Sequence, residues 1–153
     1  MKARVLVING PNLNLLGARE PGVYGAGTYS ELLELLRAAA EDRGIAICFF
    51  QSSYEGAIID ELHGTEGVYD GVIINPGAYT HYSYAIYDAL RAVDVPAAEV
   101  HISDIMSREP FRRVSVTAPA CFTQIYGEGF PGYTRALDAL LKRTGGAAGD
   151  AGD

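Results

Sequence analysis

Short apolar runs that suit β-strands alternate with amphipathic segments that suit helices along almost the whole chain. The first helical segment carries clear boundary signals, because Thr28 and Glu31 form a capping box before a leucine-rich stretch that Gly44 ends. Strands that alternate with helices are joined by crossover connections, which produce a parallel sheet covered on both faces. The expected strands are 4–8, 45–50, 71–74, 97–102 and 120–126, and the expected helices are 28–43, 53–63, 83–93 and 131–143.

This order of elements predicts one α/β domain with a flavodoxin-like fold, a doubly wound, five-stranded parallel sheet with strand order 2-1-3-4-5. The domain is expected to span 1–143. The remaining residues, 144–153, are rich in glycine and alanine and lack apolar bulk, so a disordered tail is expected there. In such sheets ligands bind beyond the carboxyl ends of the strands, at the switch point between strands one and three.

Polar residues follow three of the expected strands at that edge of the sheet. Asn12 follows the first strand, Asn75 and His81 follow the third, and the fourth carries Glu99 and His101. His101 has an ordinary pKa near neutrality, and Glu99 shares its face of the strand and can orient the imidazole. Each of these residues also has a structural interpretation, since histidines occur in cores and asparagines cap turns. Their shared location is what predicts an acid–base site.

A long loop, 9–27, connects the first strand to the first helix, whereas most connections have about 4 to 6 residues. It carries Asn12, Asn14, Arg19 and Tyr24. Tyr24 is a poor base at its ordinary pKa of about 10, but a guanidinium such as that of Arg19 would favour the phenolate. The glycines around Tyr24 would allow this loop to close over a substrate.

The formal net charge of −7 argues against nucleic acid as a partner. Arginines nevertheless cluster at 108, 112 and 113, which favours either a small anionic substrate or surface ion pairs with acids such as Glu109. No apolar run approaches the roughly 18 residues of a membrane span. The first strand begins too early to leave room for a signal peptide, so a cytoplasmic location and no membrane partner are expected.

Several other chemistries lack their sequence motifs. The chain has no phosphate-binding P-loop, no dinucleotide fingerprint and no nucleophile elbow. His81, His101 and Glu99 could ligate a metal, but no recognised ligand spacing supports it. Cys48 and Cys121 lie in apolar runs and are expected to be buried free thiols.

Five short motifs follow one another along the chain. They are 8–17 (INGPNLNLLG), 19–21 (REP) with Tyr24-Gly25, 73–81 (IINPGAYTH), 99–103 (EVHIS), and Arg108-Glu109 with Phe111-Arg112. With these motifs the chain resembles one family, the type II 3-dehydroquinate dehydratases, from Ile8 to about Leu141. The resemblance implies reversible conversion of 3-dehydroquinate to 3-dehydroshikimate and water, without a metal or organic cofactor. It also implies a role in the shikimate pathway and aromatic amino acid biosynthesis, or in quinate breakdown, and a homo-oligomer, a dodecamer built from trimers.

The resemblance also implies a role for each matching residue. Tyr24 is the base that removes the C2 proton, Arg19 favours its phenolate, and Asn12 stabilises the enolate with an ordered water. His101, oriented by Glu99, protonates the leaving hydroxyl. The residues implied in substrate binding are Asn75, His81, Ile102, Ser103 and Arg112, with Asp88 reaching the site of a neighbouring subunit.

The chain departs from the family pattern at a few positions. Tyr82 replaces the usual threonine, Asp104 an asparagine, Met106 a histidine, and Ser53-Tyr54 an Asn-His pair. Asp104 matters most, because an added carboxylate beside His101 would repel an anionic substrate or raise the pKa of His101. Two alternatives therefore stay open, a non-catalytic anion-binding homologue and a lyase that acts on another hydroxylated cyclic acid.

Overall fold

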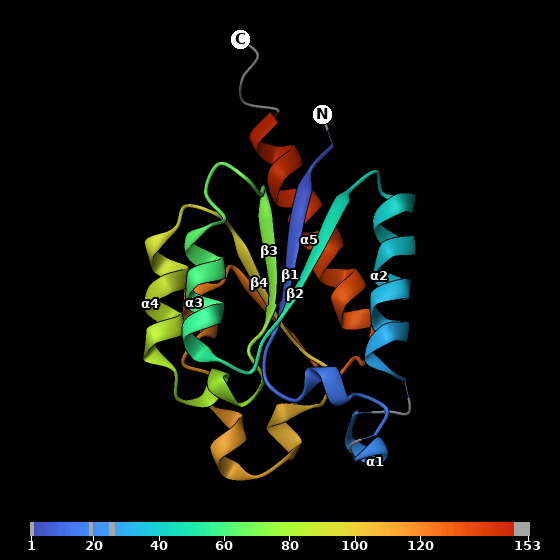
Figure 1. Cartoon of the computed structure of the whole chain (residues 1–153), viewed down its shortest axis with the longest axis vertical. Helices are drawn as coiled ribbons and strands as arrows, with labels where there is room; N and C mark the ends of the chain where they lie inside the picture. Colours follow the sequence, from blue (N-terminus) through green and yellow to red (C-terminus); the bar gives the residue numbers. More distant parts are fainter. Residues whose placement is uncertain (1, 19, 25–26, 149–153) are drawn as a thin grey trace.

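Five parallel strands form a single sheet in the order β2-β1-β3-β4-β5, which confirms the expected flavodoxin-like topology (Figure 1). A computed structural model provides the coordinates, and it describes residues 2–18, 20–24 and 27–148. β1 pairs with β2 on one side and with β3 on the other. The direction in which the chain adds strands to the sheet therefore changes at β1, which makes the ends of β1 and β3 the switch point. The strands are β1 (Arg4–Asn9), β2 (Ala46–Gln51), β3 (Gly71–Asn75), β4 (Ala97–His101) and β5 (Thr123–Tyr126).

Helices cover both faces of the sheet, and each face has its own apolar core. α2 (Tyr29–Asp42) and α5 (Pro131–Ala148) lie on one face, whereas α3 (Glu55–His63) and α4 (Tyr84–Ala92) lie on the other (Figure 1). The first core includes Leu32, Leu36 and Leu137, and the second includes Ile58, Leu62 and Ile86, all fully buried. The two cores hold the strands rigidly, so residues at the strand ends have fixed positions.

The capping box at the start of α2 is present as expected. The Thr28 hydroxyl accepts from the Glu31 backbone N–H at 3.1 Å, and the Glu31 carboxylate accepts from the Thr28 N–H at 3.3 Å. This reciprocal pair satisfies two backbone donors at the helix end. The helix therefore begins at a defined residue directly after the opening loop.

The ends of several elements differ from the expected ranges. β5 begins at Thr123 rather than at 120, because Pro119 has no N–H for a strand ladder and lies instead in the short 3-10 helix η5 (Ala118–Ala120). α5 extends beyond 143 to Ala148 despite Gly145 and Gly146, so the helix includes the first part of the expected tail. Residues 149–153 lie outside the described part of the chain, and a disordered tail stays a prediction there.

Short helices that were not expected gather at the carboxyl ends of the strands, at the lower end of the molecule in Figure 1. They have only one or two turns each, and isolated helices of that length have little intrinsic stability. Contacts with the rest of the domain stabilise these short helices, so the periodicity of the sequence does not predict them. They are α1 (Pro21–Tyr24), η1 (Leu13–Leu15), η2 (Gly77–His81), η3 (Ile105–Ser107) and η4 (Pro110–Arg113).

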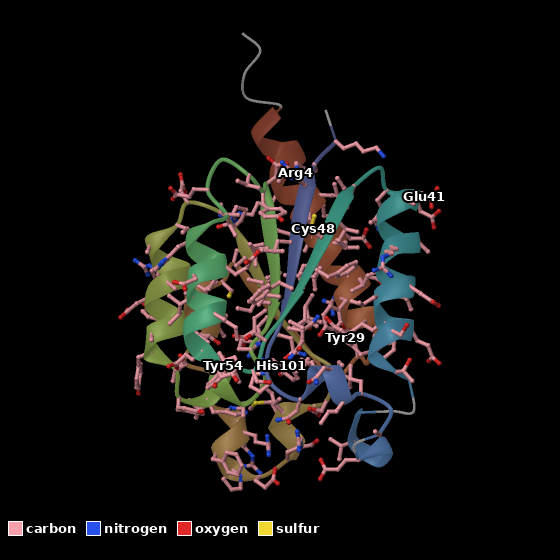
Figure 2. All side chains as sticks on the ribbon, in the orientation of Figure 1. Arg4, Tyr29, Glu41, Cys48, Tyr54 and His101 are labelled. Atoms are coloured by element: carbon pink, nitrogen blue, oxygen red, sulfur yellow. The ribbon has the colours of Figure 1, made fainter. Side chains whose placement is uncertain are left out.

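Both cysteines are free thiols, but the expectation that both are buried was wrong. Cys48 is exposed and Cys121 is half-buried. Cys48 lies on β2, which is an edge strand of the sheet and so has a neighbouring strand on one side only (Figure 2). An apolar run therefore identified the strand but not its position in the sheet.

None of the helices in the described residues is long and apolar enough to cross a membrane.

Candidate active site

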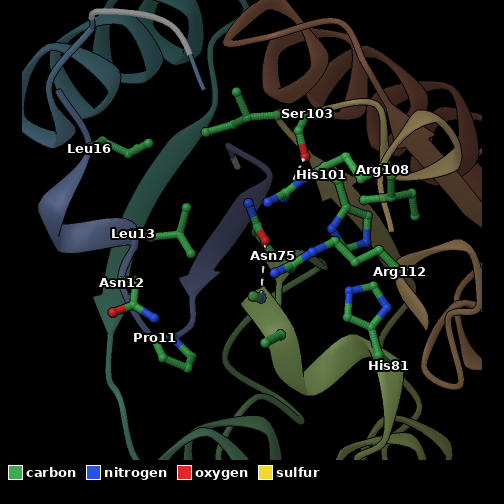
Figure 3. Close-up of a pocket in the computed structure, with 14 residues that line it drawn as sticks. Pro11, Asn12, Leu13, Leu16, Asn75, His81, His101, Ser103, Arg108 and Arg112 are labelled. Atoms are coloured by element: carbon green, nitrogen blue, oxygen red, sulfur yellow. Dashed lines mark hydrogen bonds between the residues drawn. The ribbon is translucent and has the colours of Figure 1, made fainter. Parts of the chain in front are cut away.

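A pocket opens at the carboxyl ends of β1, β3 and β4, at the switch point where the sequence placed a site (Figure 3). It encloses about 650 Å³ of space, including its open mouth. Asn75 lies between two walls in Figure 3, with Leu13 and Leu16 on one side and His81, His101 and Arg112 on the other. The full lining is Pro11, Asn12, Leu13, Leu16, Asn75, Gly77, Ala78, His81, His101, Ile102, Ser103, Ile105, Arg108 and Arg112.

The polar wall of the pocket favours an anion. Arg108 and Arg112 both line it, and no acidic residue does so within the described part of the chain. Glu109 accepts from Arg112 Nε at 2.7 Å and so fixes this guanidinium, while Arg108 donates to the Ser103 hydroxyl at 3.4 Å. Two positioned guanidiniums beside apolar leucines suit a compact ring that carries a carboxylate.

Glu99 and His101 form a buried pair at the base of this wall. Both lie on β4, and His101 Nε2 is 3.0 Å from Glu99 Oε2. Burial alone would raise the pKa of Glu99, but hydrogen bonds from His101, Thr117 and Ser115 together lower that pKa below its ordinary value. Because the carboxylate accepts at Nε2–H, the other ring nitrogen, Nδ1, is the one that can serve a substrate. The pair is therefore arranged for proton transfer at Nδ1.

His81 is arranged to accept a hydrogen bond rather than to transfer a proton. Its Nδ1 lies 2.8 Å from the Val114 carbonyl oxygen, which can only accept, so Nδ1 carries the proton. Burial, together with the nearby His101 and Arg112, lowers the pKa of His81 below its ordinary value. A neutral ring with a proton on Nδ1 leaves Nε2 as an acceptor. His81 is thus suited to accepting a hydrogen bond from a substrate hydroxyl rather than to donating a proton.

The turns after β1 and β3 pack directly on each other. Gly10 donates its N–H to the Asn75 carbonyl at 2.8 Å, and a Cβ added at Gly10 would lie 2.4 Å from the Pro76 oxygen. Only glycine allows this approach. Asn12 adopts a left-handed backbone with φ of +70°, which asparagine tolerates better than most residues. The sequence Asn-Gly-Pro-Asn therefore brings Asn12 to the pocket rim.

Asn75 is held from behind by a buried chain of hydrogen bonds. Its Nδ2 donates to the Tyr133 hydroxyl at 3.0 Å, and Tyr133 donates to Asn9 Oδ1 at 2.7 Å. Its Oδ1 accepts from the Gly77 N–H at 3.1 Å. Burial raises the pKa of Tyr133 well above its ordinary value, so its hydroxyl stays protonated and continues to donate. The Asn75 amide therefore has one orientation, with its second N–H free for a ligand.

We predict that Tyr133→Phe lowers the free energy of unfolding by about 1–3 kcal/mol, because buried amide groups of Asn75 and Asn9 lose their partner. KM should rise as well, since the Asn75 amide is no longer fixed. Urea denaturation and steady-state kinetics measure the two effects. Tyr126→Phe removes a hydroxyl from an exposed tyrosine and is the matched control. Equal stability of the two variants would contradict this role for Tyr133.

The structure brings most of the described residues expected at the site to this pocket, and two of the expected side chains lie outside its described part. Asp88 is exposed on α4 and does not line it. Tyr24 ends α1, but its side chain, like the whole of Arg19, lies outside the described residues. Asn12, Asn75, His81, His101, Ile102, Ser103 and Arg112 all line the pocket.

The residues that depart from the family pattern do not line the pocket. Asp104 does not line it, because its carboxylate accepts from the Met106 N–H at 3.0 Å and caps η3. This local role gives no support to the expected repulsion of a bound anion. Tyr82, Met106 and Tyr54 are 60%, 46% and 77% exposed and also do not line it. The departures therefore leave the pocket lining unchanged.

The sequence did not single out two features of the site. Arg108 belongs to the arginine cluster, but its place in the pocket depends on the turn after β4. Four neutral donors around Glu99 were missed entirely, because they come from three separate segments. They are Thr80, Ser115, Thr117 and Gln124.

A flavodoxin-like sheet with a buried Glu–His pair and an arginine-lined pocket at its switch point defines an α/β enzyme of the acid–base type. The family model described as dehydroquinase class II matches residues 3–141, and the chain belongs to that family.

Relatives of known name agree with this assignment. A 3-dehydroquinate dehydratase from Bacillus cytotoxicus is 54% identical over 144 residues, which are 94% of this chain and 99% of that protein. The crystal structure of a type II dehydroquinase from Butyrivibrio crossotus matches with a TM-score of 0.89 and 48% identity, over 91% of this chain and 97% of that one. A type II dehydroquinase from Propionibacterium acnes also gives a TM-score of 0.89, at 39% identity, over 93% and 98% of the two chains.

Proposed function

We propose that this chain is a 3-dehydroquinate dehydratase, a hydro-lyase that interconverts 3-dehydroquinate with 3-dehydroshikimate and water. The observation that carries the proposal is the Glu99–His101 pair at the base of an arginine-lined pocket, in a chain of the class II dehydroquinase family. The substrate is a hydroxylated ring with one carboxylate. The pocket offers cationic groups for that carboxylate and a proton donor for the leaving hydroxyl.

In the proposed reaction, the Tyr24 phenolate removes a proton from C2, and the electrons of the C–H bond move toward the C3 carbonyl to form an enolate. The Arg19 guanidinium favours the phenolate, and Asn12 at the rim stabilises the enolate oxygen with a water. The enolate then collapses to form the C1–C2 double bond and expels the C1 hydroxyl. His101 protonates that hydroxyl, which leaves as water, and solvent returns the proton from Tyr24 to His101.

The environment of His101 supports its part in this reaction. Glu99 is ionised and accepts from Nε2, so it stabilises the positive imidazolium that holds the second proton on Nδ1. The neutral His81 and the amide of Asn75 would bind substrate hydroxyls, while Arg112 and the Ile102–Ser103 segment would bind the carboxylate. The proton donor His101 lies on β4, while the binding groups lie mostly on other elements at the same edge of the sheet.

We predict that purified protein converts 3-dehydroquinate in the presence of a chelator at the same rate as without it. The product is a conjugated enone, so turnover appears as rising ultraviolet absorbance. Within the described residues no three His, Cys, Asp or Glu side chains form a metal-binding group. Binding of 3-dehydroquinate by folded protein with no rise in absorbance would favour the non-catalytic homologue instead. A panel of other hydroxylated cyclic acids would reveal a different lyase.

The proposal includes assembly into trimers and a dodecamer. Asp88 lies on the exposed side of α4, away from its own pocket, as a residue that serves a neighbouring subunit must. Large exposed side chains lie on segments close to it, including Tyr54, Tyr82 and Tyr84. A mass from light scattering that is a multiple of three chains supports this assembly, and a monomer mass contradicts it.

A further inference from the structure

Glu99 is completely buried, yet no lysine or arginine side chain donates a hydrogen bond to it among the described residues. Uncharged donors surround it instead. Ser115 and Gln124 donate to Oε2 at 2.8 and 2.9 Å, and Thr80 donates to Oε1 at 3.1 Å. The Thr117 hydroxyl also donates to Oε1. With His101 on Oε2, five hydrogen-bonding groups surround one carboxylate, and the Thr80 hydroxyl also lies 2.8 Å from the Ser115 and Thr117 hydroxyls.

These donors come from separate parts of the chain that the fold brings together. Gln124 on β5 is the register partner of Glu99 on β4. Thr80 belongs to η2, and Ser115 and Thr117 lie between η4 and η5. The Val116 N–H donates to the Thr80 carbonyl at 2.7 Å, which pins these two segments together. We call Thr80, Ser115 and Thr117 the hydroxyl cradle.

Each cradle hydroxyl has a single hydrogen, and Thr80 Oγ1 also lies 2.8 Å from the Ser115 and Thr117 oxygens, so the three hydroxyls share their hydrogens between one another and Glu99. An ionised carboxylate only accepts, so it suits a surrounding made of donors. The bonds from His101, Thr117 and Ser115 accordingly lower the pKa of Glu99 below its ordinary value. Because the cradle is neutral, it holds the negative charge without cancelling it, and the charge stays available to the His101 imidazolium.

We propose that Thr117 is a positioning residue for the dehydration, because its hydroxyl, with the rest of the cradle, keeps Glu99 ionised and turned toward His101 Nε2. Thr117 is fully buried and does not line the pocket, so it acts on the substrate only through Glu99 and His101. The expected change in kcat rests on the proposed function, whereas the expected change in the titration of Glu99 does not.

Other ionisable groups around the pair are few. His81 from η2 and Arg112 from η4 lie on the same wall of the pocket as His101, and the charges of Glu99, His101 and Arg112 all act on His81. Cys121 lies near Glu99 after η5, and burial raises its pKa far above the ordinary value, so this thiol stays neutral. None of these groups donates a hydrogen bond to Glu99 among the described contacts, so none of them replaces a cradle hydroxyl that is removed.

Thr117→Val tests the proposal, because it keeps the side-chain shape and removes the hydroxyl. The Glu99 carboxylate then loses a donor, so its pKa should rise by about one unit, and the acid limb of the kcat profile should move up in pH by the same amount. We expect kcat near neutral pH to fall about tenfold with little change in KM. Thr117→Ser keeps the hydroxyl and should restore the wild-type profile.

Thr65→Val is the matched control, since Thr65 is also fully buried and its hydroxyl donates to the Leu62 carbonyl at the end of α3. It should lower Tm without moving the acid limb. If Thr117→Val does not fold, Ser115→Ala removes a half-buried member of the cradle and should give a smaller shift in the same direction.

Carbon-13 NMR of Glu99 measures its titration without any turnover. A raised Glu99 pKa in Thr117→Val supports the cradle even if the wild-type protein fails to convert 3-dehydroquinate. An unchanged Glu99 titration, or an equal shift of the acid limb in Thr65→Val, would overturn it.

Discussion

Replacing Tyr24 with phenylalanine is expected to lower kcat for 3-dehydroquinate by about 10²- to 10⁴-fold, the usual contribution of a general base. Phenylalanine keeps the ring but has no oxygen to accept the C2 proton. The dissociation constant for substrate should change little, because the pocket groups that hold the carboxylate and hydroxyls are on other elements. Stopped-flow or steady-state absorbance gives kcat, and calorimetry gives the dissociation constant.

Tyr82→Phe is the control for this experiment, since Tyr82 is 60% exposed and does not line the pocket. It should leave kcat unchanged. Near-normal turnover by Tyr24→Phe would mean that another group removes the proton, and Tyr24 would lose its role in the reaction.

Replacing His101 with asparagine is expected to lower kcat by a similar factor of about 10² to 10⁴, because the leaving hydroxyl then departs without a proton. Asparagine can still donate toward Glu99, so the buried carboxylate keeps a partner. The wild-type pH profile adds a second check. Activity should fall as the pH drops below the lowered pKa of Glu99, where the protonated carboxyl no longer supports the imidazolium.

His81→Asn provides the contrast for this variant. His81 lines the same pocket, but its Nδ1 is committed to the Val114 carbonyl and burial lowers its pKa. Its loss should therefore raise KM more than it lowers kcat. If the two histidine variants lost kcat equally, the assignment of His101 as the acid would not hold.

The sheet and its site edge could be predicted from sequence because both depend on short patterns. Apolar runs identified all five strands, and the two-residue spacing of Glu99 and His101 placed both on one strand face. Parallel topology then brought the ends of β1, β3 and β4 together. The strand pattern and the parallel topology were therefore sufficient to predict the position of the pocket.

The surroundings of Glu99 could not be predicted in the same way. Ser115 and Thr117 lie in an irregular segment whose path depends on the contact between Val116 and Thr80, 36 residues apart in the sequence. The role of Asp104, in contrast, could have been predicted from a local sequence pattern. An aspartate directly before a short turn commonly caps it, and Asp104 does so.

Exchange of the C2 hydrogen of 3-dehydroquinate in deuterated water tests the account most directly, because it separates proton removal from loss of water. The His101→Asn variant should still incorporate deuterium at C2, since Tyr24 can form the enolate, but should release almost no 3-dehydroshikimate. Tyr24→Phe should do neither. Proton NMR of the recovered substrate measures the exchange, and deuterium incorporation by Tyr24→Phe at the wild-type rate would contradict the proposed division of roles.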